Sequence, residues 1–358
     1  MKKVLVAMSG GVDSSVTAKL LADRGYQCMG CTMKLYDNAD AGIEATRTCC
    51  ALDDVEDARA VAYRLHIPHY VFNFKDAFRE QVIGAFAEAY ENGLTPNPCI
   101  DCNKYLKFGA LLHRAKVLGC DYIATGHYAQ ITQSEDGKYH LKMAADPSKD
   151  QTYFLYGMTQ DQLAHTLFPL GEMTKEETRR LAEEGGFVNA RKPDSQDICF
   201  APDGDYAGAV ERHTGRKSKP GNFVDREGNV LGEHKGIIHY TVGQRRGLGI
   251  SAEGRLYVQE VDPVRNEVIL GDNDGLFSRE LYVEDFHWIS GEVPVGPVPC
   301  QGKIRSRHSP QPAVAYPDPD GKGARVVFDQ PQRAITPGQA VVLYDGDEVL
   351  GGGVIARK

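Results

Sequence analysis

Short apolar runs alternate with helically spaced apolar residues over the first 130 positions of the chain. Residues 4–7 predict a buried strand, and Val16, Leu20 and Leu21 then predict a helix that ends at Gly25. Downstream, the pattern predicts strands at 26–36, 69–74 and 120–125, and helices at 52–66, 78–89 and 111–118. Strands alternating with helices indicate parallel βαβ units. We therefore expect an α/β fold with a doubly wound parallel sheet, in which loops at the carboxyl ends of the strands form the functional site.

The pattern changes in the second half of the chain. Residues 148–187 read as mostly helical, with a turn at 168–171, and 191–202 as a polar loop. A short helix at 205–213 is followed by hairpin turn signals, and beyond Leu281 by short strands between Gly, Pro and Asp turns. We predict three domains: the α/β domain over 1–202, a small central α+β domain over 203–278, and an antiparallel β-barrel over 279–358.

The composition and the charge of the chain exclude several classes of protein. The net charge of −8 excludes a molecule that binds nucleic acid through its total charge, so any RNA site must depend on local basic clusters. No apolar run approaches the length of a membrane span or a signal segment, so we expect no membrane partner. Nine cysteines are too few for a disulfide scaffold in 358 residues, which favours a reducing cytoplasm.

The stretch from Ala7 to Ser15 carries the strongest chemical signal. A strand ends in Ser9-Gly10-Gly11 and a helix follows at once. Glycines allow a sharp turn and close approach of a ligand, and a helix N-terminus favours an anion, so the loop predicts a phosphate site. Asp13 would repel a phosphate unless a cation such as Mg²⁺ bridged them. The alternative is a glycine-rich turn without a ligand.

This loop lacks the lysine of the common P-loop. It resembles instead the pyrophosphate loop (PP-loop) of N-type ATP pyrophosphatases, the adenine nucleotide alpha-hydrolase-like enzymes. That resemblance implies cleavage of ATP between the α and β phosphates and an adenylate left on a substrate oxygen.

Three groups of cysteines need separate interpretations. Cys28 and Cys31 lie on a predicted strand and point to opposite faces, which favours packing over metal binding. Cys102 is expected to open a helix after the proline-held loop 95–98, and the helix terminus with Lys104 and Lys107 predicts a lowered thiol pKa. Cys199 lies in a polar loop that could bring it to Cys102 for a transient disulfide; the alternative is an uninvolved thiol beside apolar residues.

The chain resembles the tRNA-specific 2-thiouridylase family along essentially its whole length. The matching stretches are 7–15, 30–34, 95–108, 124–128, 149–155, 168–171, 192–200, 240–247 and 336–339. The resemblance implies ATP-dependent 2-thiolation of the wobble uridine in a tRNA anticodon, with AMP and pyrophosphate as products. Uridine O2 would be adenylated, a persulfide on Cys199 would supply sulfur to C2, and Cys102 would resolve the persulfide as a nucleophile. A sulfur relay would deliver the persulfide to Cys199, and the implied partner is a sulfur-relay donor protein or a sulfide source.

The resemblance also implies binding residues. ATP, with Mg²⁺, would lie against Ala7, Met8, Ser9, Gly10, Gly11, Val12, Asp13, Ser14, Met33 and Gly126. The target base would contact Asn97, Pro98 and Cys99. The tRNA anticodon stem-loop would contact the central domain and His127, Lys149, Asp150, Gln151, Arg305, Ser306 and Gln339. Lys303, Arg305, Arg307 and His308 form the clearest basic cluster of the predicted barrel, as phosphate binding requires.

One position departs from the family pattern, because many members have Asp where this chain has Cys99. The three cysteines Cys99, Cys102 and Cys199 then invite a further hypothesis, a [4Fe-4S] cluster with one open iron. Two other functions stay open at this point: an amidotransferase-type synthetase, and a nucleotide-sensing RNA-binding protein without sulfur chemistry.

Overall fold

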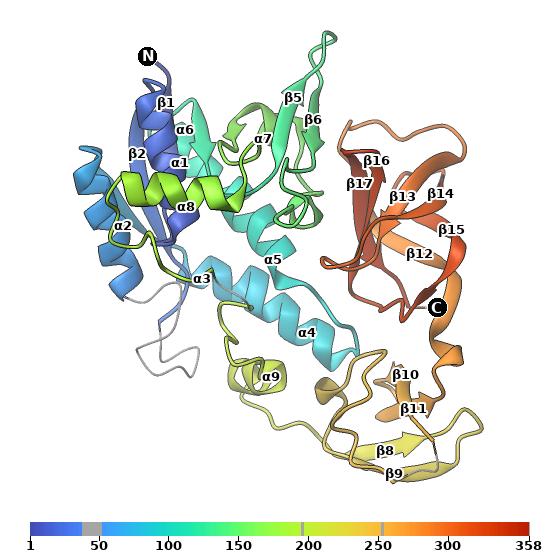
Figure 1. Ribbon diagram of the computed structural model, residues 1–358. Helices are drawn as coiled ribbons and strands as arrows, with labels where there is room; N and C mark the ends of the chain where they lie inside the picture. Colours follow the sequence, from blue (N-terminus) through green and yellow to red (C-terminus); the bar gives the residue numbers. More distant parts are fainter. Residues whose placement is uncertain (38–51, 195–196, 252–253, 358) are drawn as a thin grey trace.

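The computed structural model describes residues 1–37, 52–194, 197–251 and 254–357 (Figure 1). Cys49 and Cys50, with nearly all of the loop predicted at 37–50, lie outside the described residues.

A five-stranded parallel sheet forms the centre of the first domain. Its strands are β1 (Lys3–Ala7), β2 (Gln27–Lys34), β3 (His69–Asn73), β4 (Tyr122–Ala124) and β7 (Thr166–Leu167). Their order is β3-β2-β1-β4-β7, so the direction of winding reverses between β2 and β4, on the two sides of β1. The predicted doubly wound sheet is confirmed, and its reversal point opens at the end of β1, where such sheets bind ligands.

Helices cover both faces of this sheet, since alternate side chains of β1 enter different cores. Val4 and Val6 pack with α1 (Val12–Asp23), α2 (Leu52–Arg64) and α8 (Lys175–Glu184). Leu5 packs on the other face, against the helical stretch that includes Phe108. The segments of that stretch are α5 (Pro98–Asp101), η2 (Cys102–Leu111) and α6 (Leu112–Val117). A second helical stretch runs through α3 (Lys75–Phe78), η1 (Arg79–Gly84) and α4 (Ala85–Glu91).

The region from 130 to 187 differs from the expected pattern. The predicted helical region 148–187 contains η3 (Thr152–Phe154), α7 (Gln160–Ala164), β7 and α8, with loops between them. Before it lies a hairpin of β5 (Gln130–Gln133) and β6 (Tyr139–Lys142) that the sequence analysis assigns to no element. The expectation of mostly helix was wrong here because capping residues at Thr159 and Thr174 limit two short helices.

The central part of the chain is a small mixed α+β unit. Its elements are α9 (Tyr206–Thr214), β8 (Gly221–Val224), β9 (Val230–His234), η4 (Ile237–His239), β10 (Tyr257–Asp262), β11 (Glu267–Gly271) and η5 (Asp274–Leu276). The sheet order is β10-β11-β8-β9, and α9 lies against α4. One apolar cluster therefore includes Phe86 of the first domain together with Val210 and Phe223.

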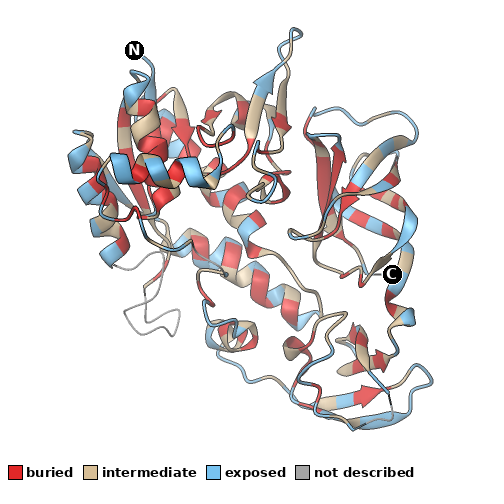
Figure 2. Ribbon diagram, viewed as in Figure 1, coloured by how far each residue is buried: buried red, intermediate tan, exposed pale blue. Residues whose placement is uncertain are grey.

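The last part is a closed antiparallel barrel. Its strands are β12 (Phe277–Trp288), β13 (Val298–Lys303), β14 (Gln311–Pro317), β15 (Ala324–Arg333), β16 (Ala340–Asp345) and β17 (Glu348–Ile355). The order is β12-β15-β14-β13-β16-β17, and β12 also pairs with β17, which closes the ring. Figure 2 shows buried positions along these strands. The apolar core of the barrel includes Leu281, Val326 and Phe328.

The hairpin of the first domain extends this barrel sheet. β6 pairs with β17 through Lys142 and Glu348, and the backbone N–H of Met143 donates to Asp347 at 2.7 Å. Among the described helices, none is long and apolar enough to cross a membrane.

Candidate functional site

The loop after β1 has the geometry of an anion site. Gly10 has φ +77°, and a Cβ there would collide with the backbone of Asp54, so glycine is required. Helix α1 begins after Gly11 without a side-chain cap. The Ser14 hydroxyl donates to Gly11 O at 3.0 Å and accepts from Ser9 N at 3.2 Å, which closes the turn. The N–H groups at the start of α1 are therefore not capped by a side chain and can receive a phosphate.

Gly126 brings the end of β4 against this loop. A Cβ on Gly126 would lie 2.8 Å from Ser14 N and 2.9 Å from the carbonyl carbon of Asp13. Any side chain at Gly126 would therefore push the end of β4 away from the first turn of α1. The structure brings together Gly126 and the loop 7–14, which come from separate parts of the sequence.

The Asp13 carboxylate is already balanced by a cation of the protein. Asp13 Oδ1 accepts from Lys175 Nζ at 2.6 Å and from the Tyr128 hydroxyl at 3.0 Å. Mg²⁺ bound with ATP phosphates commonly takes only one or two protein carboxylates, so Asp13 fits such a role beside a nucleotide.

A cavity of about 330 Å³, here called the central cavity, joins this loop to the cysteines. Its walls include predicted ATP, base-contacting, catalytic and tRNA-binding residues from six separate stretches: Ala7, Met8, Ser9, Asp13, Ser14, Met33, Pro98, Cys99, Cys102, Gly126, His127, Gln151 and Cys199. Asn97 precedes the lining residue Pro98, and its side chain caps α5.

Cys102 is not at a helix N-terminus, contrary to the sequence expectation. The helix begins four residues earlier, where Asn97 Oδ1 accepts from Cys99 N at 3.2 Å and Pro98 takes the first position. Cys102 therefore lies one turn inside the helix. Burial raises its pKa, and Lys107 offsets this only in part. The predicted lowering of the pKa was wrong because the helix boundary was placed too late.

Cys99 as a whole residue is exposed to solvent. Burial of its thiol among protein atoms nevertheless raises the pKa of that thiol to about 11. The interpretation of Cys28 and Cys31 as packed residues agrees with the structure, because both are buried and burial raises the pKa of each thiol.

The segment with Cys199 is fixed to the end of β2. The Tyr36 hydroxyl donates to Cys199 O at 2.7 Å, and Phe200 is buried against Phe78 and Phe86. Cys102 and Cys199 pack against the same apolar cluster. Both cysteines also line the central cavity.

The three cysteines do not form a metal site in this structure. Within the described residues, no group of three or more His, Cys, Asp or Glu side chains is arranged to hold a metal ion. As they are arranged here, the three thiols do not fit a [4Fe-4S] cluster, and we derive no step through one.

His127, Gln151 and Gln339 hold loops in place. His127 is buried between Phe108 and Phe168, and burial keeps its pKa well below the usual value, so the ring is neutral. Gln151 accepts from Tyr128 N at 2.9 Å, and Gln339 donates to Thr95 O at 2.7 Å.

The basic cluster expected on the barrel is less exposed than its sequence indicates. Lys303 is buried and lies 3.7 Å from the Asp150 carboxylate, which is itself only 1% exposed. Arg305 donates to Ala334 O and to Thr336 Oγ1. The prediction of an exposed basic cluster was wrong for Lys303, because its position on β13 faces the first domain. Arg307 is exposed, and Ser306 is half-buried.

Sequence reasoning missed an ionic network beside the nucleotide loop. Lys175 contacts Asp13 and also Asp194, which further binds Lys149 at 3.0 Å and Arg179 at 3.1 Å. The capping pattern from Thr174 to Glu177 marks the start of α8, but no local pattern points from Lys175 to a carboxylate 162 residues away.

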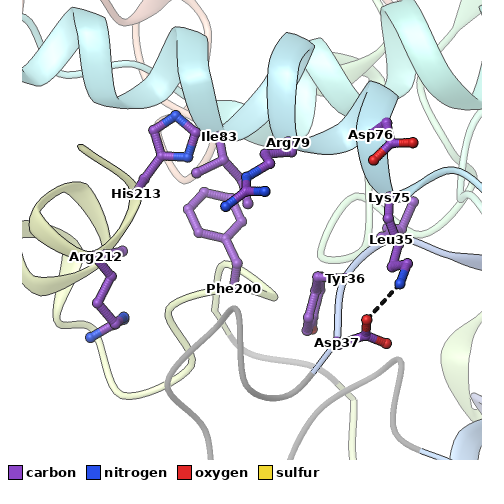
Figure 3. A pocket seen from close by; sticks show the side chains of 11 residues that line it. Leu35, Tyr36, Asp37, Lys75, Asp76, Arg79, Ile83, Phe200, Arg212 and His213 are labelled. Carbon is purple, nitrogen blue, oxygen red and sulfur yellow. Dashed lines mark hydrogen bonds and ion pairs between the residues drawn. The ribbon is translucent and has the colours of Figure 1, made fainter. Parts of the chain in front are cut away.

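A larger polar cavity of about 560 Å³ lies beside the central cavity (Figure 3). The two share Leu35 and Phe200 as lining residues. Lys75 there is paired with Asp37, as the dashed line in Figure 3 marks. None of the described residues that line the larger cavity is a predicted site residue.

Comparisons with known proteins identify the chain's relatives. Family models match residues 2–203 (tRNA methyl transferase HUP domain), 209–272 (tRNA methyl transferase PRC-barrel domain) and 278–355 (Aminomethyltransferase beta-barrel domain). Three similar proteins are each named tRNA-specific 2-thiouridylase MnmA. That of Acetivibrio thermocellus is 51% identical and covers 99% of both chains. That of Clostridioides difficile is 49% identical over 100% of this chain and 99% of the relative. That of Carboxydothermus hydrogenoformans is 52% identical over 100% of this chain and 98% of the relative. With half of its residues identical along its whole length, this chain belongs to the family of tRNA-specific 2-thiouridylases.

Proposed function

We propose that this chain catalyses ATP-dependent 2-thiolation of the wobble uridine in tRNA anticodons, in the cytoplasm. The observation that carries the proposal is the central cavity, which joins an anion-binding loop to Cys102 and Cys199. The relatives are named tRNA-specific 2-thiouridylases, which agrees with thiolation at position 2 of a tRNA uridine. A nucleotide loop and two nearby thiols together suit adenylation followed by sulfur transfer.

In the first step, uridine O2 attacks the α-phosphorus of ATP and pyrophosphate leaves. The amides at the start of α1 would bind the phosphates, and Gly126 and Met33 would lie beside the nucleotide. Mg²⁺, held by Asp13 and the phosphates, would offset negative charge on the leaving group. The step converts a poorly reactive carbonyl oxygen into part of a good leaving group.

In the second step, the terminal sulfur of a Cys199 persulfide attacks C2 of the base and AMP leaves. The Cys102 thiolate then attacks Cys199 Sγ, the S–S bond to the base breaks, and 2-thiouridine is released with a Cys102–Cys199 disulfide. An external dithiol reduces that disulfide. Because burial raises the Cys102 pKa, the cation of Lys107 is the nearby group that favours the thiolate.

The proposal assigns Asn97, Pro98 and Cys99 to the target base. Contacts with tRNA would come from the central domain and from His127, Lys149, Asp150, Gln151, Arg305, Ser306 and Gln339. Since the structure buries the carboxylate of Asp150 and the ring of His127, their effect on RNA would pass mainly through the loops that they hold. The base leaves a single-stranded anticodon loop, where extrusion costs little. A persulfide-bearing relay protein would transfer its outer sulfur to the Cys199 thiol and be left as a thiol. A sulfide source would instead supply hydrosulfide that attacks C2 directly, without a persulfide on Cys199.

The test incubates the chain with tRNA, ATP and a persulfide-bearing sulfur donor and measures the nucleosides by mass spectrometry, with AMP and pyrophosphate measured in parallel. Cys199→Ala should still release pyrophosphate but form no 2-thiouridine, and Cys300→Ala, on the barrel, serves as a matched cysteine control. Formation of ADP instead of AMP, or full thiolation by Cys199→Ala, would contradict the proposal.

A further inference from the structure

Lys175 lies between the nucleotide loop and the segment that leads to Cys199. Its side chain is only 11% exposed, and its Nζ lies 2.6 Å from Asp13 Oδ1 and 2.7 Å from Asp194 Oδ1. Asp13 is in the first turn after the loop, and Asp194 precedes Cys199 by five residues. One buried ammonium group thus bridges the two functional segments.

The position of Lys175 is fixed by its own helix. Thr174 and Glu177 form a capping box at the start of α8, which sets the backbone of the first turn. Helix α8 packs against α1. The Tyr128 hydroxyl bonds both to Asp13 and to Thr178 Oγ1 of α8, at 3.0 Å each. The lysine is therefore held toward the loop by more than its two ion pairs.

The segment before Cys199 is anchored to the same region. Asn189 Nδ2 donates to Gly10 O at 2.8 Å and to Ser15 Oγ at 2.9 Å. Lys192 lies 2.7 Å from Asp57 of α2. Burial alone would raise the pKa of Asp194, but its bonds to Lys175 and Lys149 outweigh burial and keep the pKa low, so the carboxylate is ionised. Asp194 ends this anchored stretch on the side of Cys199.

We propose that Lys175 is a positioning residue that couples nucleotide binding at the loop to the placement of Cys199. The inference rests on the proposed function. ATP brings phosphate charge next to Asp13, and Lys175 is the buried cation that Asp13 shares with Asp194. A change in the charge around Lys175 therefore acts directly on Asp194, at the start of the segment that leads to Cys199. Without the lysine, two carboxylates that now share one cation would face each other and repel.

The test measures alkylation of Cys199 by iodoacetamide, by peptide mass spectrometry, with and without ATP and Mg²⁺. This readout needs neither tRNA nor a sulfur donor, so it is separate from the thiolation assay. We expect ATP to change the alkylation rate of the unmodified chain at least about threefold, and to leave it unchanged in Lys175→Met. A merely structural role would shift the rate with and without ATP by the same factor.

Two further variants complete the test. Asp194→Asn keeps the Lys175–Asp13 pair and should also lose the response to ATP, which keeps the proposal testable if Lys175→Met folds poorly. Arg180→Gln, on the exposed side of α8, is the matched control and should respond normally. An unmodified response to ATP in Lys175→Met or Asp194→Asn, or no response in the unmodified chain, would overturn the proposal. In the thiolation assay, Lys175→Met should lose more 2-thiouridine than pyrophosphate, by about tenfold in their ratio.

Discussion

A thiol one turn inside a helix, beneath apolar side chains, differs from a thiol at an exposed helix terminus. Cys102 is of the first kind, and its pKa is raised. The nucleophile proposed for the last step is therefore mostly protonated at neutral pH. Its reactivity depends on proximity to Cys199 more than on a preformed thiolate.

The raised pKa of the Cys102 thiol predicts how the rate of its alkylation depends on pH. In a Cys99→Ala, Cys199→Ala background, alkylation of Cys102 should rise about tenfold per pH unit from pH 7 to 9, because the thiolate fraction rises in that proportion below the pKa. Lys107→Met should slow the reaction, since loss of the cation favours the neutral thiol. Peptide mass spectrometry over a pH series measures both rates. A plateau below pH 8 would contradict the raised pKa.

The turn after β1 could be predicted from the sequence because its signals are local: a strand, two glycines, hydroxyls and a helix start. Lys175 could not, because its ion pairs with Asp13 and Asp194 depend on how α8 folds back onto α1. The direction of the Cys102 pKa was mispredicted for a related reason. A four-residue error in a helix start moved the thiol from the terminus to the interior.

At the scale of elements, the helical stretch from Pro98 to Val117 carries two cavity cysteines on its first turns. Its start depends on one side chain, since Asn97 caps the first turn. The cap fixes Cys99 directly and Cys102 one turn later.

Removing this cap should loosen the first turn. We expect Asn97→Ala to cost about 1 kcal/mol of local stability and to speed hydrogen exchange of amides 99–101 about fivefold. Asn97→Asp keeps a capping oxygen and is the matched control, with exchange close to that of the unmodified chain. Equal exchange in Asn97→Ala and the unmodified chain would show that the turn does not depend on the cap.

Regular alternation made the parallel sheet and its helices predictable, and the short strands with turn signals made the barrel predictable. The hairpin of β5 and β6 could not be predicted from the sequence. β5 lies at the edge of the sheet and pairs with β6, and β6 in turn pairs with β17, which lies far along the sequence. Local pattern holds no information on such a partner.

At the scale of the whole molecule, a buried ion pair joins the first domain to the barrel. Lys303 of β13 lies beside Asp150, whose carboxylate also accepts from Thr152 Oγ1. Loss of this contact would leave a buried charge without its counter-charge. We therefore expect the two domains to unfold together.

Breaking one side of the pair tests this coupling. Lys303→Met should destabilise the barrel by about 3 kcal/mol, because it leaves the Asp150 carboxylate without its cation. The double variant Lys303→Met, Asp150→Asn should recover most of the loss. Trp288, the single tryptophan of the chain and a buried residue of β12, reports barrel unfolding in urea. A double variant no more stable than Lys303→Met alone would contradict the argument.

The strand β6 completes its pairing only with β17, which the ribosome makes roughly 200 residues later. During synthesis, the finished first domain must therefore present an open strand edge until β17 has been made. Nascent chains that stall or end early would keep that edge available to one another, and truncated products of this gene should be prone to aggregation even when their α/β domain is intact.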